Sequence, residues 1–255
     1  MLRVGTVPYL VARPLTQGLA ADPKIVLTVA EPAQLARGLA DGFLDVALAS
    51  SVLAAAPPRL PFWLDGPVIA SQGPIRSVLL FLRPELRGPR EVRRWISDPA
   101  SRTGRALAQV LLRDLWEAPT ERLDPPPGDL FDAADQLGAD AVQMIGDPAL
   151  RACAEHADWH AVDLGEAWRD LTGLPFVFAG WIGRAGFDFS RGVPELETAA
   201  VRGLEILPAM AEEEGHRHPL GAEFVRRYLL HDLVWRLPRH TVMESLAAFS
   251  RRLED

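Results

Sequence analysis

The 255-residue sequence predicts an α/β protein with two lobes and a ligand cleft between them. Two observations support this prediction: strand-like and helix-like segments alternate along much of the chain, and one helix–strand unit occurs twice. A strand, a helix and a second strand in this order imply a parallel pair of strands. The chain is long enough for one large domain or for two of ordinary size.

The start of the chain contains the clearest alternation of elements. A short apolar segment ends at Pro8, as expected of a strand, and Pro32 stands where the first turn of a helix tolerates proline. Leu35, Ala36 and Leu39 then fall on one face of that helix. These patterns predict strands at residues 2–7, 25–30 and 46–49 and helices at residues 14–21 and 32–40.

The repeated unit comprises residues 39–50 and residues 137–146. In each copy a helix end and a glycine precede an aspartate, a buried strand follows, and small polar residues come after it. We interpret the copies as equivalent units, one in each lobe; chance similarity between two helix–strand units is the alternative. Ligands collect at the carboxyl ends of strands in open α/β sheets, so both polar strand ends are expected to face one crevice.

Two extended apolar runs, residues 77–82 and 174–181, are candidates for the segments where the chain crosses between the lobes. We therefore assign residues 1–82 and 180–255 to the first lobe and residues 83–179 to the second. The last third of the chain has amphipathic patterns. They predict helices at residues 194–214, 222–235 and 242–253.

Composition and charge argue against several classes of function. The net charge of −7 and the lack of a basic tract argue against a nucleic-acid partner. No apolar run is long enough to cross a bilayer, and the N-terminus lacks the features of a secretory signal, so we expect a cytoplasmic protein without membrane contact. Cys153 is the only cysteine and the six histidines form no ligand-like cluster, so we expect neither an intrachain disulfide nor a metal.

Three polar segments lie at predicted strand ends or turns, where hydroxyl and guanidinium groups can bind a carboxylate. For each of them, helix capping or an ordinary turn is the alternative. The three segments are Ser50–Ser51, the stretch from Ser71 to Ser77 that includes Arg76, and Gly146–Asp147.

A fourth polar segment, Ser101-Arg102-Thr103, precedes a stretch with a helical apolar pattern. The N-terminus of a helix carries free N–H groups and partial positive charge, so it attracts anions without a basic side chain. The hydroxyls of Ser101 and Thr103 strengthen the prediction of an anion site, and plain N-capping is the alternative.

Several short strings of the sequence form an ordered set. They are residues 7–10, 13–15, 73–79, 101–103 and 145–150, followed by Asp163-Leu164-Gly165 with Trp168 and by residues 172–179. Over most of residues 1–185 the sequence resembles the chorismate dehydratases of the menaquinone pathway. Single strings are weak indicators, but their common order makes the resemblance fairly specific.

The resemblance implies a fold like that of the type II periplasmic binding proteins, with a mixed sheet in each lobe and the ligand cleft between the lobes. It implies a lyase that converts chorismate to 3-[(1-carboxyvinyl)oxy]benzoate with loss of water, the first step of the futalosine route to menaquinone. No cofactor is expected. The expected partner is the small anionic substrate, bound by a monomer or a homodimer.

The polar segments and the resemblance together give the expected site, in which no residue is assigned as the proton acceptor. We expect Ser101, Thr103 and the adjacent backbone to hold one carboxylate, and Tyr9 and Phe176 to wall the ring. Arg13 or Arg76 is expected to offset the substrate's charge. The remaining candidates for substrate contact are Val11, Ser50, Ser51, Ser71, Ser77, Gly146 and Asp147.

Two positions depart from the family pattern. Val11 stands where the family usually has an asparagine expected to touch the reacting ring, and Gly104 stands where it has a serine. A valine side chain neither hydrogen-bonds nor transfers a proton, so a non-catalytic binding protein for a small carboxylate is one alternative. The related enzyme that acts on cyclic dehypoxanthine futalosine is another; there we expect a catalytic histidine in the second lobe, and no cleft motif here contains one.

Overall fold

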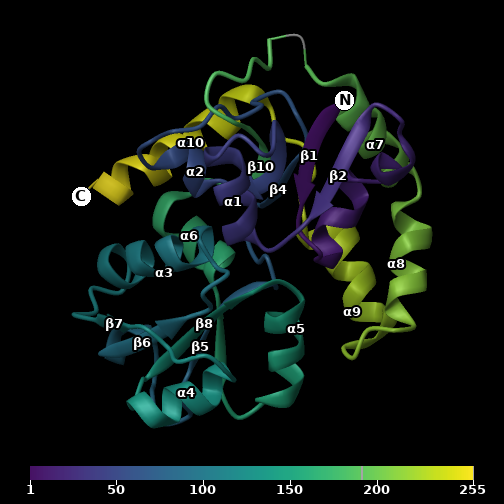
Figure 1. The fold of residues 1–255 in the computed structure, drawn as a ribbon. Coiled ribbons are helices and arrows are strands. Elements are labelled where there is room, and N and C mark those ends of the chain that lie inside the picture. Colours follow the sequence, from purple (N-terminus) through teal and green to yellow (C-terminus); the bar gives the residue numbers. More distant parts are fainter. Residues whose placement is uncertain (191, 255) are drawn as a thin grey trace.

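The computed structural model describes residues 1–190 and 192–254 and contains two five-stranded sheets. Figure 1 shows the two sheets in separate lobes, one above the other, with helices packed around each sheet. The predicted two-lobed α/β architecture is therefore confirmed.

The first sheet consists of β1 (Leu2–Thr6), β2 (Ile25–Val29), β3 (Val46–Ser50), β4 (Val68–Ser71) and β10 (Phe176–Gly183). Its strand order is β2-β1-β3-β10-β4. Strand β1 is parallel to both β2 and β3, whereas β10 is antiparallel to both β3 and β4.

The second sheet consists of β5 (Val78–Leu82), β6 (Arg94–Ser97), β7 (Glu121–Leu123), β8 (Ala141–Ile145) and β9 (His160–Asp163). Its strand order is β7-β6-β8-β5-β9. Strand β6 is parallel to β7 and β8, and β5 is antiparallel to β8 and β9. Each lobe therefore has a mixed sheet, as expected.

The helices cover the sheets and occupy most of the last third of the chain (Figure 1). The α-helices are α1 (Pro32–Ala40), α2 (Val52–Ala55), α3 (Thr103–Asp114), α4 (Leu130–Leu137), α5 (Gly146–Glu155), α6 (Leu164–Thr172), α7 (Pro194–Glu205), α8 (Leu207–Gly215), α9 (Gly221–Arg227) and α10 (Arg239–Glu254). Shorter helical segments are the 3₁₀ turns η1 (Leu10–Leu15), η2 (Leu19–Ala21) and η3 (Pro89–Glu91), and the π-helical segment η4 (Tyr228–Asp232).

The repeated unit occupies the same place in both sheets. Helix α1 precedes β3, helix α4 precedes β8, and both strands are third in the strand order of their sheet. The interpretation of residues 39–50 and 137–146 as equivalent units is therefore confirmed.

Strand β5 and residues 176–179 of β10 lie in the opposite lobe from the one predicted. Val78–Leu82 was assigned to the first lobe but pairs in the second sheet, and the start of Phe176–Gly183 was assigned to the second lobe but pairs in the first. The chain crosses just before each strand, at residues 72–77 and 173–175. Every residue of β5 is buried, so its apolar pattern fits the interior of either sheet.

Three predicted helices are divided in the structure. The helix predicted at residues 14–21 is replaced by η1 and η2, which are separated by residues 16–18, and Gly18 before η2 has a φ of 82°. Residues 194–214 form α7 and α8, because Pro208 has no N–H to continue the hydrogen bonds of α7. Residues 222–235 form α9 and then η4, which ends at Asp232.

An aromatic cluster joins the last helix to the region between the lobes. The ring of Phe176 contacts Trp168 of α6, Phe178 and Phe249 of α10, with ring centroids 4.9, 4.7 and 4.9 Å apart. Aromatic pairs at these separations stabilise a core beyond the area they bury. Helix α10 is therefore part of the core behind β10 rather than an appendage.

Asp45 joins β1 to β3, and its replacement by asparagine is expected to destabilise the protein at neutral pH. Its carboxylate accepts from the backbone N–H and the guanidinium of Arg3, at 3.0 Å and 2.6 Å, and from Arg184 at 3.2 Å. These donors hold the pKa of the Asp45 carboxyl far below its usual range. Because this group is partly exposed, we expect a loss of about 1 kcal/mol.

The loss should depend on pH in a defined direction. A carboxyl whose pKa is lower in the folded state stabilises that state above its unfolded pKa, and the stabilisation disappears as the pH falls. Urea unfolding of wild type and Asp45→Asn should thus differ at pH 7 and converge as the pH falls below about 4. A difference that stays constant down to pH 2 would contradict this assignment.

Candidate functional site

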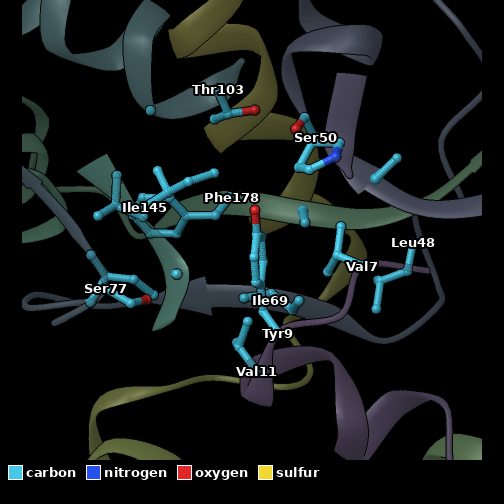
Figure 2. Close-up of a pocket in the computed structure, with 17 residues that line it drawn as sticks. Val7, Tyr9, Val11, Leu48, Ser50, Ile69, Ser77, Thr103, Ile145 and Phe178 are labelled. Carbon is cyan, nitrogen blue, oxygen red and sulfur yellow. The ribbon is translucent and has the colours of Figure 1, made fainter. Parts of the chain in front are cut away.

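A pocket of about 620 Å³, counted to its open mouth, lies between the two lobes. It is lined by Tyr9 and Val11 from the start of the chain and by Ser50 at the end of β3. Thr103 at the start of α3 and Gly146 at the start of α5 line it from the other lobe. Figure 2 shows the Tyr9 hydroxyl pointing toward the space between Ser50 and Thr103.

Six of the predicted contact residues line this one pocket. They are Tyr9, Val11, Ser50, Ser77, Thr103 and Gly146. The polar ends of β3 and β8 therefore do face a common crevice, as the repeated unit predicted. Their role in binding a substrate remains a prediction.

Three predicted serines lie behind the pocket wall instead of lining it. Ser51 and Ser101 are fully buried, and within the described part of the chain their hydroxyl oxygens have no hydrogen-bond partner. The Ser71 hydroxyl donates to the carbonyl oxygen of Gly73 at 2.7 Å, so it shapes the turn at the first crossing.

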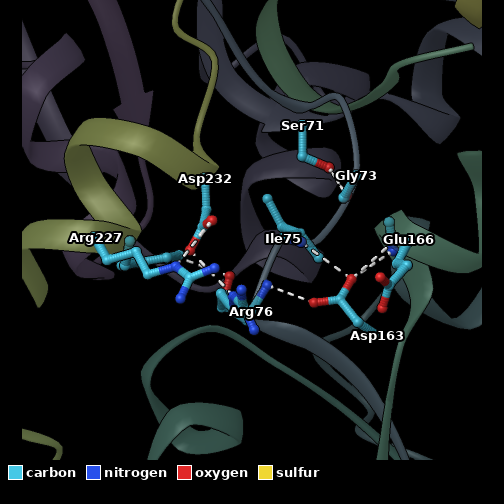
Figure 3. Close-up of polar contacts among 11 residues, drawn as sticks. Ser71, Gly73, Ile75, Arg76, Asp163, Glu166, Arg227 and Asp232 are labelled. Atoms are coloured by element: carbon cyan, nitrogen blue, oxygen red, sulfur yellow. Dashed lines mark hydrogen bonds and ion pairs between the residues drawn. The ribbon is translucent and has the colours of Figure 1, made fainter. Parts of the chain in front are cut away.

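The two arginines expected to offset charge are engaged away from the pocket. Arg13 forms an ion pair with Glu214, and the Arg76 Nε lies 3.0 Å from an oxygen of Asp232, which also pairs with Arg227 at 3.7 Å. Figure 3 shows Arg76 directed toward Asp232. Neither guanidinium is among the residues that line the pocket.

Asp147 and Phe176 also have other surroundings than expected. The Asp147 carboxylate accepts from the backbone N–H of Leu10 at 3.2 Å, and burial raises the pKa of this carboxyl. This contact joins α5 to η1 across the cleft. Phe176 is fully buried in the aromatic cluster, and Phe178, two residues further along β10, lines the pocket instead.

The start of α3 forms the polar wall of the pocket. Thr103 Oγ1 accepts from the backbone N–H of Val52 at 3.2 Å, which connects the first turns of α3 and α2. The N-terminus of the twelve-residue helix α3 also carries free N–H groups and partial positive charge. An anion can therefore be bound here although no basic side chain of the described residues lines the pocket.

Gly104 packs closely against Gln143, a buried polar residue that the sequence analysis missed. A Cβ atom at Gly104 would lie 2.6 Å from both Gln143 Nε2 and Ser101 Oγ, which is closer than real Cβ atoms approach. The serine usual in the resembling family would therefore require the Gln143 or Ser101 side chain to shift here. The tight packing explains why glycine fits this position in this chain.

Glu31 and Tyr228 are two further polar residues that the sequence analysis missed. The Tyr9 hydroxyl donates to Glu31 at 2.7 Å, and the Tyr228 hydroxyl lies 2.9 Å from Ser77 Oγ. These partners are 22 and 151 residues apart in the sequence, so no local motif links them.

The remaining wall of the pocket is apolar and includes Val7, Leu48, Ile69, Ile145 and Phe178 (Figure 2). A mostly apolar pocket with a few placed hydroxyls suits a small ring that carries polar substituents. Within the described residues no group of histidine, cysteine and carboxylate side chains is arranged to hold a metal ion. The described helices include none that is both long and apolar enough to span a membrane.

Solved structures with a similar fold come from several sources. Protein AF1704 of Archaeoglobus fulgidus superposes with a TM-score of 0.68 at 14% identity, over 99% of this chain and 95% of that one. The alkanesulfonate-binding protein SsuA of Xanthomonas axonopodis pv. citri, bound to MOPS, gives 0.66 at 18% identity over 99% and 93%. The Candida albicans CA3427 product, described as having the generic periplasmic binding protein fold, gives 0.62 at 12% over 100% and 90%.

These similarities show the fold, which is that of the periplasmic binding proteins, as the sequence predicted. Identities this low carry no conclusion about the ligand. A family model described as menaquinone biosynthesis matches residues 2–255, which is nearly the whole chain. The chain therefore belongs to the menaquinone biosynthesis family.

Proposed function

We propose that this protein is a chorismate dehydratase, a lyase that converts chorismate to 3-[(1-carboxyvinyl)oxy]benzoate and water. The observation that supports this most is the interlobe pocket, in which hydroxyl groups and the N-terminus of α3 face a largely apolar wall. Chorismate combines a small ring with two carboxylates and one hydroxyl, so it matches this combination of surfaces. The family membership provides the metabolic context.

The proposed reaction depends more on how the protein positions the substrate than on a strongly catalytic group. The C–H bond breaks at the ring carbon that carries the ether, and the C–O bond breaks at the neighbouring hydroxyl-bearing carbon. The electron pair of the C–H bond becomes a ring π bond, and the proton and hydroxide leave as water. The ring becomes aromatic and no electrons are gained or lost, so the chemistry requires no redox cofactor.

The residues of the pocket have distinct parts in this proposal. Thr103 and the N-terminus of α3 bind a carboxylate, and Ser50 and Ser77 bind further oxygens of the substrate. The hydrogen bond from the Val52 N–H to Thr103 Oγ1 links the two lobes beside the pocket, and in this proposal that closed arrangement keeps water from the bound ring. We place the reaction in the cytoplasm, where a free thiol such as that of Cys153 is stable.

A binding protein without catalytic activity is the second candidate. The pocket lining contains no carboxylate, histidine or lysine side chain among the described residues, and Val11 lines it at the position of the family's asparagine. Of the side chains that the structure describes, Tyr9 is thus the one ionisable group in the lining. This observation favours binding of a small carboxylate without proton transfer.

Turnover of chorismate distinguishes the two candidates. Purified protein mixed with chorismate should produce the ultraviolet spectrum of a substituted benzoate, with one product molecule formed for each chorismate consumed. Saturable binding without that spectrum would refute the dehydratase and support the binding protein. If Val11→Asn then gained turnover, the missing polar group at this position would be identified as the cause.

Thr103→Val tests the anion site in the same assay. It removes the hydroxyl but keeps the shape of the side chain, and alone or with Ser101→Ala it should raise KM about tenfold to a hundredfold. Ser97→Ala is the control, because the Ser97 hydroxyl is buried in the same lobe but does not line the pocket. An unchanged KM in Thr103→Val would refute the site at α3.

A further inference from the structure

The hydroxyl of Tyr9 is fixed as a hydrogen-bond acceptor toward the pocket. Its oxygen lies 2.7 Å from Oε2 of Glu31, and a carboxylate can only accept, so the phenol proton is directed at Glu31. Burial and the neighbouring Glu31 raise the pKa of Tyr9 well above its usual value, so the proton stays on the phenol. Only the lone pairs of the Tyr9 oxygen remain for a ligand.

The hydroxyl of Ser77 is fixed in the opposite sense. Tyr228 is completely buried, and burial raises the pKa of its phenol, which therefore keeps its proton. Within the described residues the phenol has one hydrogen-bond partner, Ser77 Oγ at 2.9 Å. Tyr228 must therefore donate to Ser77, and the proton of Ser77 is free to be donated into the pocket.

The hydroxyl of Thr103 is likewise a donor. Its oxygen accepts from the backbone N–H of Val52, which can only donate, so the hydroxyl proton points elsewhere. Thr103 lines the pocket beside the free N–H groups of α3. The pocket thus presents donors at Ser77 and Thr103 and an acceptor at Tyr9.

We infer that Tyr9, held by Glu31, selects a ligand hydroxyl, while Ser77 and Thr103 take the ligand's carboxylate oxygens. The ligand class is an anionic ring that also carries a free hydroxyl. Glu31 and Tyr228 are positioning residues, since each acts by fixing the proton of a residue that touches the ligand. The inference rests on the proposed function for the identity of the ligand, because chorismate has this combination of groups.

The acceptor at Tyr9 separates substrate from product. Dehydration removes the only hydroxyl of chorismate outside its carboxylates, so the product offers no donor to Tyr9. A site built to bond a hydroxyl strongly disfavours the analogue that lacks it, because its own polar group is left unpaired. We expect wild-type protein to bind the product at least tenfold more weakly than the substrate, which promotes product release.

Tyr9→Phe tests this directly. The variant keeps the ring that packs against Gly146 and removes the acceptor, so the ratio of the product's inhibition constant to the substrate's KM should fall close to one. Ser77→Ala is the matched control. It removes a donor to the carboxylates that both molecules carry, so both constants should rise together and their ratio should stay at the wild-type value.

Glu31 provides an independent variant. Glu31→Leu frees the phenol proton of Tyr9 and should abolish the discrimination, whereas Glu31→Gln keeps an acceptor oxygen and should retain most of it. A purely structural effect of Glu31 would change both ligands equally and would not be rescued by glutamine. The pair therefore separates positioning of the Tyr9 proton from loss of helix α1, which begins at the next residue.

The outcomes for the inference and for the proposed function are distinguishable. If wild-type protein does not turn chorismate over, the proposed function fails, and the two dissociation constants measured by calorimetry replace KM and the inhibition constant. The inference is overturned if wild-type protein binds both molecules equally, or if Tyr9→Phe keeps the wild-type ratio.

Discussion

Replacing Gly203 with alanine is expected to destabilise the protein by about 3 kcal/mol and to weaken ligand binding. A Cβ at Gly203 in α7 would lie 1.9 Å from the carbonyl oxygen of Pro14 and 2.6 Å from its carbonyl carbon. These are backbone atoms of η1, so no side-chain rotation relieves the clash. Either α7 or η1 must move, and η1 carries Val11 of the pocket wall.

The measurement is urea unfolding together with chorismate binding. Gly88→Ala is the matched control, because a Cβ there meets nothing within 4 Å and the backbone is extended, with φ of 170°. The control should unfold within about 0.5 kcal/mol of wild type. Equal stability of the Gly203 and Gly88 variants would show that α7 does not fix the position of η1.

The sequence was sufficient to predict the two-lobed architecture, because the same local pattern appears wherever a strand holds the same place in a sheet. The aspartate before each buried strand and the polar residues after it mark the same position in both sheets. Ser50 and Gly146 line one pocket because the carboxyl ends of β3 and β8 both point into the cleft. The positions of the strand ends were therefore enough to predict that Ser50 and Gly146 lie in the site, because the backbone topology alone places them there.

The lobes of β5 and of residues 176–179 of β10 could not be found by this kind of inference. A strand that is buried along its whole length carries no alternation to show which sheet it joins. Its place is decided by antiparallel pairing, such as that of Leu80 with Gln143 in β8. Leu80 and Gln143 are far apart in the sequence, so no local pattern indicates that they pair.

The same limit applies to the charged residues of the site. Arg13 and Arg76 were expected near the ligand, but their carboxylate partners are 201 and 156 residues away, in the last third of the chain. Glu31 was missed because its role depends on a single contact with Tyr9. A charged side chain can be assigned to a ligand only when its competing partners are known.

Replacing Asp163 with alanine is expected to lower the free energy of unfolding by about 4 kcal/mol and to raise KM for the ligand. Its carboxylate accepts from Ile75 and Arg76 at 3.0 and 2.7 Å, and from Gly165 and Glu166 at 2.9 and 3.2 Å (Figure 3). One side chain thus caps α6 and fastens the first crossing between the lobes.

The crossing matters because it sets the position of Ser77. Arg76 has a φ of 66°, a left-handed conformation that costs a non-glycine residue about 1–3 kcal/mol and persists only when its surroundings hold it. The bond from its N–H to Asp163 is one of those restraints. Without it we expect the crossing to relax and the neighbouring Ser77 hydroxyl to leave its place in the pocket.

Asp129→Ala distinguishes the effect of losing the contacts to the crossing segment from the effect of losing a helix cap. Asp129 caps α4 through the N–H groups of Phe131 and Asp132, at 2.8 and 3.0 Å, as Asp163 caps α6, but it holds no crossing segment. It should cost about 1 kcal/mol and leave KM unchanged. If Asp163→Ala does not fold, Asp163→Asn retains one acceptor oxygen and should show a smaller rise in KM. If the Asp129 and Asp163 variants lost equal stability and KM were unchanged in both, Asp163 would act only as a cap of α6 and would not hold the crossing.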